Sequence, residues 1–326
     1  MDKIIGLGNA LVDVLVTLKS DEVLQEMGLP KGGMTLVDKD KYQIISDLFA
    51  GLPTHQATGG SAGNAMKALA ALGAATGFIG KVGNDKKGEF FREALERQGT
   101  EAHLLVSSDL PSGVASTFVS ADGERTFGTY LGAAATLKAE ELSLDMFKDY
   151  AYLFIEGYLV QDHALILRAI ELAKEAGLQI CLDLASYNIV AGDLDFFTLL
   201  INKYVDVVFA NEEEAKAFTG LEAEEAVAAL SQICSIAVVK RGAKGALIRK
   251  GSEEYRVAAC PVQRVVDTTG AGDYFAAGFL YGLTAGYALE RCAAIGAALS
   301  KEVIQVIGAE LSEQKWDIIK KNVETL

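Results

Sequence analysis

Apolar runs alternate with amphipathic segments through the second half of the chain. The short, mostly apolar runs occupy residues 152–155, 178–182 and 205–209. Each is followed by a longer segment whose apolar positions have helical spacing, at residues 163–176, 193–203 and 211–219. Strands that are apolar on both faces and separated by helices are typical of a parallel sheet covered on both sides. The pattern therefore predicts an α/β fold with a mostly parallel central sheet.

The N-terminal third has a different pattern. Apolar and polar residues largely alternate over residues 12–18, which indicates a strand. Two further extended segments, residues 114–120 and 125–131, flank the pair Asp122–Gly123, which is typical of a tight hairpin turn. Extended segments without crossover helices do not join a parallel sheet easily. We therefore expect a small separate layer of strands outside the main sheet.

The chain length of 326 residues fits one large α/β domain, and its four prolines mark no interdomain linker. We expect a single domain over residues 1–326. It would be a three-layer sandwich with a small β-strand lid drawn from about residues 10–40 and 112–132. The lid would cover the carboxyl edge of the main sheet, where open α/β sheets bind ligands.

Composition excludes several classes of function. The 30 basic and 44 acidic residues give a net charge of −14, which argues against binding to nucleic-acid phosphates. The four cysteines are far apart and are expected to be free thiols in a reducing cytoplasm. The N-terminus does not read as a signal peptide, and the most apolar stretch, residues 274–289, is shorter than the roughly 20 residues of a membrane span. We expect a cytoplasmic protein with neither nucleic-acid nor membrane partners.

A strand-like run, a turn of small residues and a helical segment follow one another over residues 262–279. Gly270, Ala271 and Gly272 lie where the chain enters the helix, so their amides and the positive end of the helix dipole can face an anion. Asp273 follows directly. An aspartate there is also a good N-cap, worth about 1 kcal/mol, and for this loop alone that structural interpretation stays open. A carboxylate beside an anion site has a use in phosphoryl transfer, where it takes the proton of the attacking hydroxyl.

Several motifs occur in the order found in a known family. They are residues 59–64 (GGSAGN), 82–88 (VGNDKKG), 211–214 (NEEE) and 267–273 (DTTGAGD). With them the chain resembles the PfkB (ribokinase-like) carbohydrate kinase family from residue 4 to about residue 310. The spacing of Asn9 and Asp13 is closer to the adenosine kinase branch than to ribokinase. The resemblance implies a ribokinase-like fold.

The resemblance also implies a reaction, the ATP-dependent phosphorylation of a hydroxymethyl group on a sugar or nucleoside. Asp273 would be the base that deprotonates the acceptor hydroxyl. The amides of Gly270, Ala271 and Gly272 would form the anion hole for the transferred γ-phosphoryl group.

For the nucleotide, the resemblance implies that Asn211, Glu214 and Gly242 bind ATP and that Glu214 organises Mg²⁺ through water. Carboxylate and amide oxygens suit a hydrated Mg²⁺ ion. An asparagine followed by acidic residues is also good chemistry for a helix start, which is the structural alternative. Lys240 stands where the family's nucleotide loop has a threonine, so a hydroxyl contact is lost and we leave Lys240 outside the predicted site.

For the acceptor, the resemblance implies that Asp13 binds hydroxyl groups and that Asn9 assists it. A carboxylate accepts two hydroxyl hydrogen bonds at once, which suits polyol recognition. Gly59, Gly60 and Asn64 would contact the same molecule. Periodicity alone favours an exposed aspartate on the polar side of a half-buried strand.

Arg125 lies beside the predicted hairpin turn and reads either as a lid residue that reaches the phosphates or, preferably, as a solvated turn residue. Members of the family often bind a monovalent cation such as K⁺ beside the anion hole. Asp267, Thr269 and Gly308 are where such a site would fall.

Other interpretations remain. A kinase-like fold that only binds a sugar or nucleotide and regulates another process is the main alternative. Fructose, ribose, 2-keto-3-deoxygluconate and adenosine all remain open as acceptors. Phe118, Phe127 and Tyr158 suit either a purine clamp or a core. Both a monomer and a homodimer are compatible with the sequence. The chain has no P-loop, and its partial matches to a nucleophile elbow at residues 59–63 and a dinucleotide fingerprint at residues 6–11 lack their partner residues.

Overall fold

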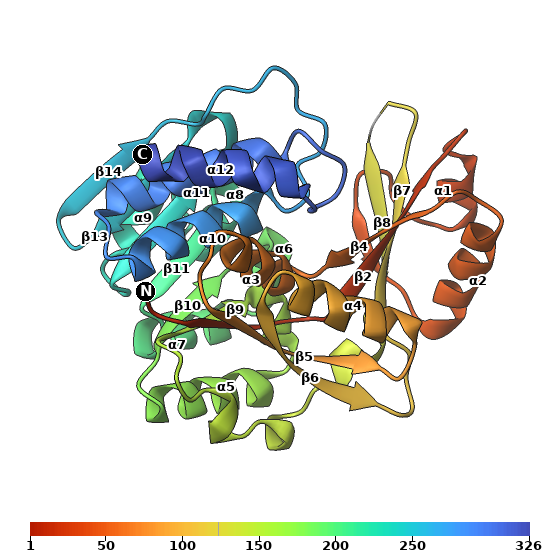
Figure 1. Ribbon diagram of the computed structural model, residues 1–326, viewed down its shortest axis with the longest axis horizontal. Coiled ribbons are helices and arrows are strands. Elements are labelled where there is room, and N and C mark those ends of the chain that lie inside the picture. Colours follow the sequence, from red (N-terminus) through yellow and green to blue (C-terminus); the bar gives the residue numbers. More distant parts are fainter. Residues whose placement is uncertain (123) are drawn as a thin grey trace.

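The computed structural model describes residues 1–122 and 124–326, so the predicted Asp122–Gly123 turn includes a residue outside the described ones (Figure 1). Within these residues the larger sheet, sheet A, has nine strands in the order β14–β13–β12–β11–β10–β9–β1–β5–β6. Its parallel strands are β1 (Ile4–Leu7), β5 (Thr76–Gly83), β6 (Thr100–Ser107), β9 (Tyr152–Glu156), β10 (Gln179–Asp183), β11 (Val207–Asn211) and β12 (Ile236–Lys240). The antiparallel strands at one edge are β13 (Ala246–Lys250) and β14 (Glu253–Val257).

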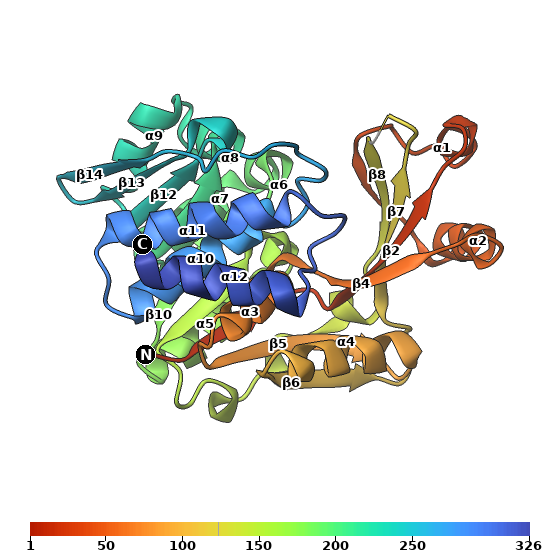
Figure 2. The same ribbon diagram turned by 45° about the horizontal axis from the view of Figure 1, so that its top comes forward.

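Helices cover both faces of sheet A (Figures 1 and 2). One apolar cluster joins the sheet to α3 (Ser61–Ala71), α4 (Lys86–Arg97), α10 (Ala271–Thr284), α11 (Leu289–Val303) and α12 (Glu313–Thr325). A second cluster on the other face joins it to α5 (His163–Glu175), α6 (Tyr187–Gly192), α7 (Leu194–Lys203), α8 (Glu212–Thr219) and α9 (Ala223–Leu230). The predicted α/β fold with a mostly parallel sheet is confirmed.

The strand sequences explain the two clusters. Successive side chains of a strand point to opposite faces, so Phe154 packs in the first cluster while its neighbours Leu153 and Ile155 pack in the second. Phe209 follows the same rule and contacts both Phe154 and a helix residue, Phe279, with ring centroids 6.2 and 5.5 Å apart. Each fully buried phenylalanine stabilises the fold by about 1.5–3 kcal/mol, which makes strands that are apolar on both faces favourable only inside such a sandwich.

A smaller sheet, sheet B, stands beside the carboxyl edge of sheet A (Figure 2). In the described part of the chain it has five strands in the order β3–β8–β7–β2–β4. They are β2 (Leu11–Thr17), β3 (Met34–Leu36), β4 (His55–Gly59), β7 (Gly113–Val119) and β8 (Arg125–Tyr130). The helices α1 (Glu22–Glu26) and α2 (Lys39–Ala50) lie along it.

The two faces of sheet B differ in their partners. On one face Tyr130 stacks on Tyr42 of α2 at 4.8 Å, and Phe118 packs against Phe49 of α2 at 5.0 Å. Because strand residues alternate, Arg125 and Phe127 lie on the opposite face from Tyr130. That opposite face is the one that meets the carboxyl edge of sheet A.

Candidate active site

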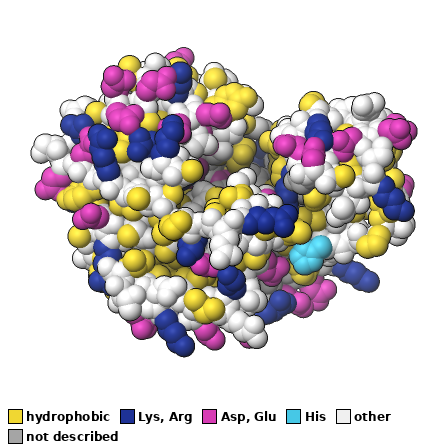
Figure 3. All heavy atoms as spheres, turned by 90° about the horizontal axis from the view of Figure 1, so that it is seen from above, with side chains coloured by type: hydrophobic (Ala, Val, Ile, Leu, Met, Phe, Trp, Pro, Cys, Tyr) yellow, Lys and Arg dark blue, Asp and Glu magenta, His cyan; other side chains and the backbone are white. Residues whose placement is uncertain are grey.

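Four polar residues end four neighbouring strands of sheet A. They are Glu156, Asp183, Asn211 and Lys240, at the carboxyl ends of β9, β10, β11 and β12. Glu156 is directly opposite Asp183 in the sheet, and Asn211 is directly opposite Lys240. The carboxyl edge therefore carries a row of charged and amide groups, and Figure 3 shows the surface hollowed between the main body and the smaller sheet B layer.

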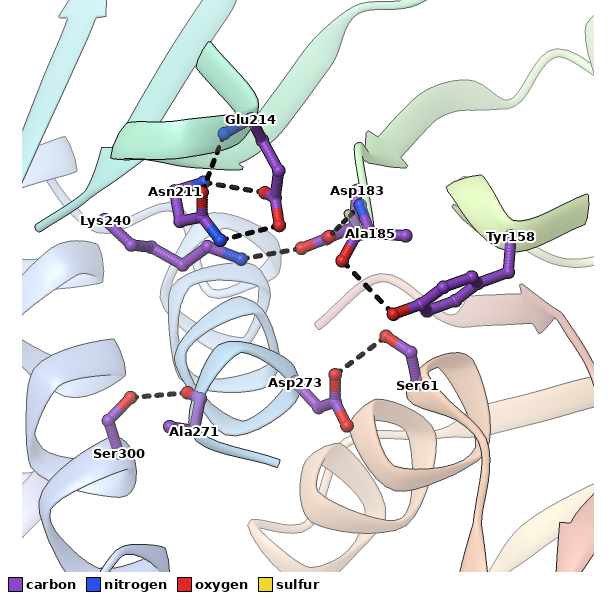
Figure 4. Close-up of polar contacts among 10 residues, drawn as sticks. All are labelled: Ser61, Tyr158, Asp183, Ala185, Asn211, Glu214, Lys240, Ala271, Asp273 and Ser300. Atoms are coloured by element: carbon purple, nitrogen blue, oxygen red, sulfur yellow. Dashed lines mark hydrogen bonds and ion pairs between the residues drawn. The ribbon is translucent and has the colours of Figure 1, made fainter. Parts of the chain in front are cut away.

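Asp273 lies in the first turn of α10 and points toward α3 (Figure 4). Ser61 Oγ donates to its Oδ1 at 2.7 Å and Asn64 Nδ2 donates to its Oδ2 at 3.0 Å. Burial raises the pKa of Asp273, and these two hydrogen bonds oppose that shift. The carboxylate is thus held in one orientation with its basicity increased, which is what a general base requires.

The loop before Asp273 has some, but not all, of the free amides expected of an anion site. Gly270 is the N-cap of α10 in the left-handed region, with φ of 77°, a conformation that favours glycine. Among the described residues, the amides of Gly270, Gly272 and Asp273 have no hydrogen-bond acceptor, as expected at a helix start. The Ala271 amide differs from the prediction because it donates to the Thr268 carbonyl at 3.1 Å.

Asp267 fixes this loop from the other side. Its Oδ1 accepts from the Thr269 amide at 3.0 Å, and its Oδ2 accepts from the Gly308 amide at 2.7 Å. Arg125, from β8 of sheet B, places its guanidinium 2.8 Å from the same Oδ2. The preferred interpretation of Arg125 as a solvated turn residue is wrong, since its side chain is only 11% exposed.

These contacts bear on the monovalent cation expected at Asp267, Thr269 and Gly308. Both oxygens of Asp267 already accept hydrogen bonds, and the positive charge beside them comes from Arg125. Arg125 therefore balances the charge of Asp267 in this structure, and a K⁺ ion at this position stays a prediction.

Asp13 on β2 faces the same space from sheet B. It lies opposite Ala57 and Ala115 on its two neighbouring strands, and a methyl group on Gly59 would collide with its carboxylate. Glycine at position 59 is therefore required by the close approach of the carboxylate. Burial raises the pKa of Asp13 to about 7, which the nearby Lys67 ammonium partly offsets and the Asp273 charge reinforces.

Asn9 and Gly60 shape the floor of the site. The Asn9 amide and its Nδ2 donate to Glu156 Oε1 at 2.8 and 2.7 Å, and the Ala62 amide donates to Oε2 at 3.0 Å. Gly60 has φ of 85° and lies against the Asn9 carbonyl. The amide group of Asn9 thus already has a protein partner, and burial raises the pKa of Glu156 to about 7.

Asn211 and Glu214 form a reciprocal cap at the start of α8. Asn211 Oδ1 accepts from the Glu214 amide at 2.8 Å, while the two Glu214 oxygens accept from the Asn211 amide and from its Nδ2, both at 2.7 Å. The alternative interpretation of this motif, as the start of a helix, is therefore also present in the fold. Glu214 is 3% exposed, and burial raises its pKa to about 7, with Lys240 opposing the shift and Asp183 adding to it.

The nucleotide loop follows β12. Gly242 lies exposed in a short 3₁₀ turn, Gly242–Lys244, with φ of 53° and open space where a side chain would stand. Lys240, which the sequence analysis left outside the site, points into it and donates to Asp183 Oδ2 at 2.8 Å (Figure 4).

The three candidate aromatic residues lie in different environments. Phe118 is fully buried in the core of sheet B. Phe127 is half-buried on the same face of β8 as Arg125. Tyr158, in the 3₁₀ turn Gly157–Gln161, donates to the Ala185 carbonyl at 3.4 Å (Figure 4).

Sequence reasoning missed Ser61, Lys67, Glu156, Asp183 and Lys240. A usable signal existed for the last three, because each is the first polar residue after an apolar run that forms a strand of sheet A. Ser61 sits inside a motif already singled out. Lys67 had no signal, because a lysine in an alanine-rich helix normally faces solvent, whereas this one is 8% exposed and bonds to Thr58.

Two absences hold for the part of the chain that the structure describes. No helix there is both long and apolar enough to cross a membrane. No group of three or more His, Cys, Asp or Glu side chains among those residues is arranged to hold a metal ion.

An oriented carboxylate beside unpaired helix-start amides, with a second buried carboxylate on a facing sheet, is an arrangement that suits phosphotransferases acting on small alcohols. The chain matches the family described as pfkB family carbohydrate kinase over residues 47–316, and it belongs to that family. It is a carbohydrate or nucleoside kinase of the adenosine kinase-like branch.

Individual relatives agree. The adenosine kinase of Schizophyllum commune is 29% identical over 350 residues, covering 97% of this chain and 99% of that protein. An uncharacterised sugar kinase of Archaeoglobus fulgidus is 29% identical over 243 residues, covering 74% and 96%. The crystal structure of a probable sugar kinase from Rhizobium etli has a TM-score of 0.89, and that of adenosine kinase from Sinorhizobium meliloti has 0.88. Both are 33% identical and cover 99% of each chain, which confirms the ribokinase-like fold.

Proposed function

We propose that this protein transfers the γ-phosphoryl group of ATP to the hydroxymethyl group of a nucleoside, with free sugars as the alternative acceptors. The observation that carries the proposal is the orientation of Asp273. Ser61 and Asn64 hold its carboxylate beside the unpaired amides of Gly270 and Gly272, so a base and an anion site lie side by side.

In the proposed reaction, Asp273 takes the proton of the acceptor hydroxyl as its oxygen attacks the γ-phosphorus. A new bond forms between that oxygen and phosphorus, the bond from phosphorus to the β–γ bridging oxygen breaks, and ADP leaves with the electron pair. The amides of Gly270 and Gly272 stabilise the negative charge on the transferring group. Asp273 then carries the proton until it is lost to solvent.

The residues present fit a nucleotide with Mg²⁺. Glu214 provides a carboxylate at the sheet edge, and Asn211 orients it. Mg²⁺ usually keeps several waters and binds one or two carboxylates together with phosphates, so we assign Glu214 to organise it through water. When bound, the ion neutralises phosphate charge. Gly242, exposed at the end of β12, is assigned to the nucleotide loop.

We assign the acceptor to the side of the site formed by β2 and α3, away from the residues assigned to the nucleotide. Asp13 offers two carboxylate oxygens, and Asn64 keeps its Oδ1 buried with no hydrogen-bond partner among the described residues. An unpaired buried acceptor is costly unless a ligand completes it. Both groups therefore suit hydroxyl donors of a ribose ring. Gly59 and Gly60 let the backbone approach this ring, and Asn9 acts through Glu156.

A nucleoside is favoured over a free sugar for two reasons. The adenosine kinases among its relatives match nearly the whole chain. Phe127, on the same face of β8 as Arg125, and Tyr158, just after the carboxyl end of β9, are also half-buried aromatic residues on which a base can stack. We further propose that residues 1–326 form one ribokinase-like domain in which sheet B is the lid, excluding water as a competing acceptor.

ADP formation from ATP and Mg²⁺ tests this function across adenosine, other ribonucleosides, ribose, fructose and 2-keto-3-deoxygluconate. We expect turnover with a ribonucleoside at a higher kcat/KM than with any free sugar. Turnover only with a free sugar would overturn the nucleoside assignment. Tight binding without any turnover would favour the non-catalytic binding protein.

A further inference from the structure

Lys240 has a position that its role as a strand residue does not explain. Its Nζ lies 2.8 Å from Asp183 Oδ2, and a methyl group built on Gly272 would lie 3.1 Å from the same Nζ. The ammonium group is therefore in direct reach of the main chain at the start of α10 (Figure 4). Glycine at position 272 keeps this approach open, because any side chain there would press on the ammonium.

The surroundings keep Lys240 charged. Burial acts to lower its pKa, but the neighbouring charges of Asp183 and Glu214 outweigh burial and raise it. The side chain is 15% exposed, so the charge is screened less than on the surface. A permanent cation thus lies beside Gly272, and the amides of Gly270 and Gly272 have no acceptor among the described residues.

In a purely structural role, Lys240 would serve only as the counter-ion of Asp183. The contacts of Asp183 argue against this role, because the Ala185 amide also donates to its Oδ1 at 2.9 Å. The Asp183 carboxylate therefore has a stabilising partner besides the lysine. The direction of the lysine also matters. From the end of β12 it crosses the end of the cleft toward α10, instead of turning out to solvent as Lys244 on the same loop does.

We propose that Lys240 binds the phosphate group that the amides of Gly270 and Gly272 hold, and that it neutralises charge on this group during transfer. The proposal rests on the function proposed above and adds a cationic phosphate ligand where the family's nucleotide loop has a hydroxyl. Lysine binds phosphate as a compact point charge with three donors, so it needs no fixed geometry. Asp183 holds the ammonium in place before the nucleotide arrives.

Binding of nucleotides tests the proposal independently of turnover. The affinities of a non-hydrolysable ATP analogue, ADP and AMP are measured by titration calorimetry with Mg²⁺ for the wild type, Lys240→Met, Lys240→Arg and Lys240→Thr. We expect Lys240→Met to lose roughly 10- to 100-fold in affinity for the triphosphate, the effect of one hydrogen bond to a charged group, and much less for AMP. Lys240→Arg should retain most of the affinity.

Lys174→Met is the matched control. Lys174 forms a similar pair with Asp206, at 2.7 Å, but at the opposite end of the strands. Its loss should leave the affinity for the triphosphate unchanged. An equal loss in Lys174→Met and Lys240→Met would overturn the proposal, because it would reflect general destabilisation.

The double variant Asp183→Asn with Lys240→Met separates phosphate binding from charge balance. If Lys240 only balances Asp183, the double variant regains both thermal stability and triphosphate affinity. Under the proposal it regains stability while its affinity stays low. Should the wild type bind no nucleotide, the proposed function itself fails; wild-type binding with unchanged affinity in Lys240→Met refutes only the role of Lys240.

Discussion

The guanidinium of Arg125 lies 2.8 Å from the carboxylate of Asp267, and this contact joins sheet B to the loop that precedes α10. One partner comes from the proposed lid and the other from the proposed anion loop. The pair is well shielded, with side chains 11% and 2% exposed. The position of the lid and the shape of the phosphate site are therefore coupled by one charged contact.

Replacing Arg125 with methionine should destabilise the protein. Removing one partner leaves the Asp267 charge buried, at a cost of about 3 kcal/mol in the free energy of unfolding. Chemical denaturation measures this loss, and adding Asp267→Asn should recover much of it. Arg256→Met removes an exposed partner of Glu254 and should cost well under about 1 kcal/mol. Similar losses in the two single variants would contradict the account.

Ser61→Ala should weaken the base without removing it. The Ser61 hydrogen bond lowers the pKa of Asp273, so its loss raises that pKa further and moves the ionisation of the carboxylate to higher pH. We expect the rising limb of the kcat profile to move to higher pH, with a loss of roughly tenfold in kcat at a pH on that limb. Ser231→Ala, which removes a remote hydroxyl on the far side of the fold, serves as the control. An unmoved limb in Ser61→Ala would exclude Ser61 as an orienting residue.

The KM for the acceptor should depend on pH through Asp13. Its pKa is raised to about 7, so the carboxylate becomes protonated and loses acceptor capacity as the pH falls below that value. The KM should therefore rise between about pH 8 and about pH 6, while the affinity for ATP changes less. Asp13→Asn should have a high KM that no longer varies in this range. A KM independent of pH in the wild type would rule out Asp13 as an ionised acceptor of substrate hydroxyls.

The protein without ligands should be more stable in mild acid than in mild base. Asp13, Glu156 and Glu214 each have a pKa raised to about 7, so the folded state binds more protons than the unfolded state between about pH 4 and about pH 7. Stability is thus highest in the lower part of this window and declines as the pH rises through 7. Melting temperatures measured across the window check the sign, and a maximum near pH 8 would contradict it.

Much of the fold could be predicted because strands that are buried on both faces must be apolar. The expected runs at residues 152–155, 178–182 and 205–209 correspond to β9, β10 and β11. The observed strands end later, on Glu156, Asp183 and Asn211 respectively. These last positions lie at the sheet edge and face the cleft, so the site rather than the core selects their side chains.

Other features depend on contacts between distant segments and have no local signature. β4 was not expected, because its sequence, HQATG, has no strand-like alternation and pairs with β2 only through tertiary contacts. The partner of Asn9 is Glu156, which is 147 residues away in the sequence. In the sequence, Lys240 replaces the threonine of the nucleotide loop, which predicts only the loss of a hydroxyl contact. The folded chain alone places its ammonium group beside Gly272.

The most direct test of the account is the turnover of Asp273→Asn compared with the wild type, together with nucleotide binding by both. Asparagine keeps the size of the side chain but cannot accept the proton, so kcat should fall by about 10² to 10⁴-fold while the affinity for ATP stays within a few-fold. A kcat close to that of the wild type would show that Asp273 is not the base, and the central claim would fail.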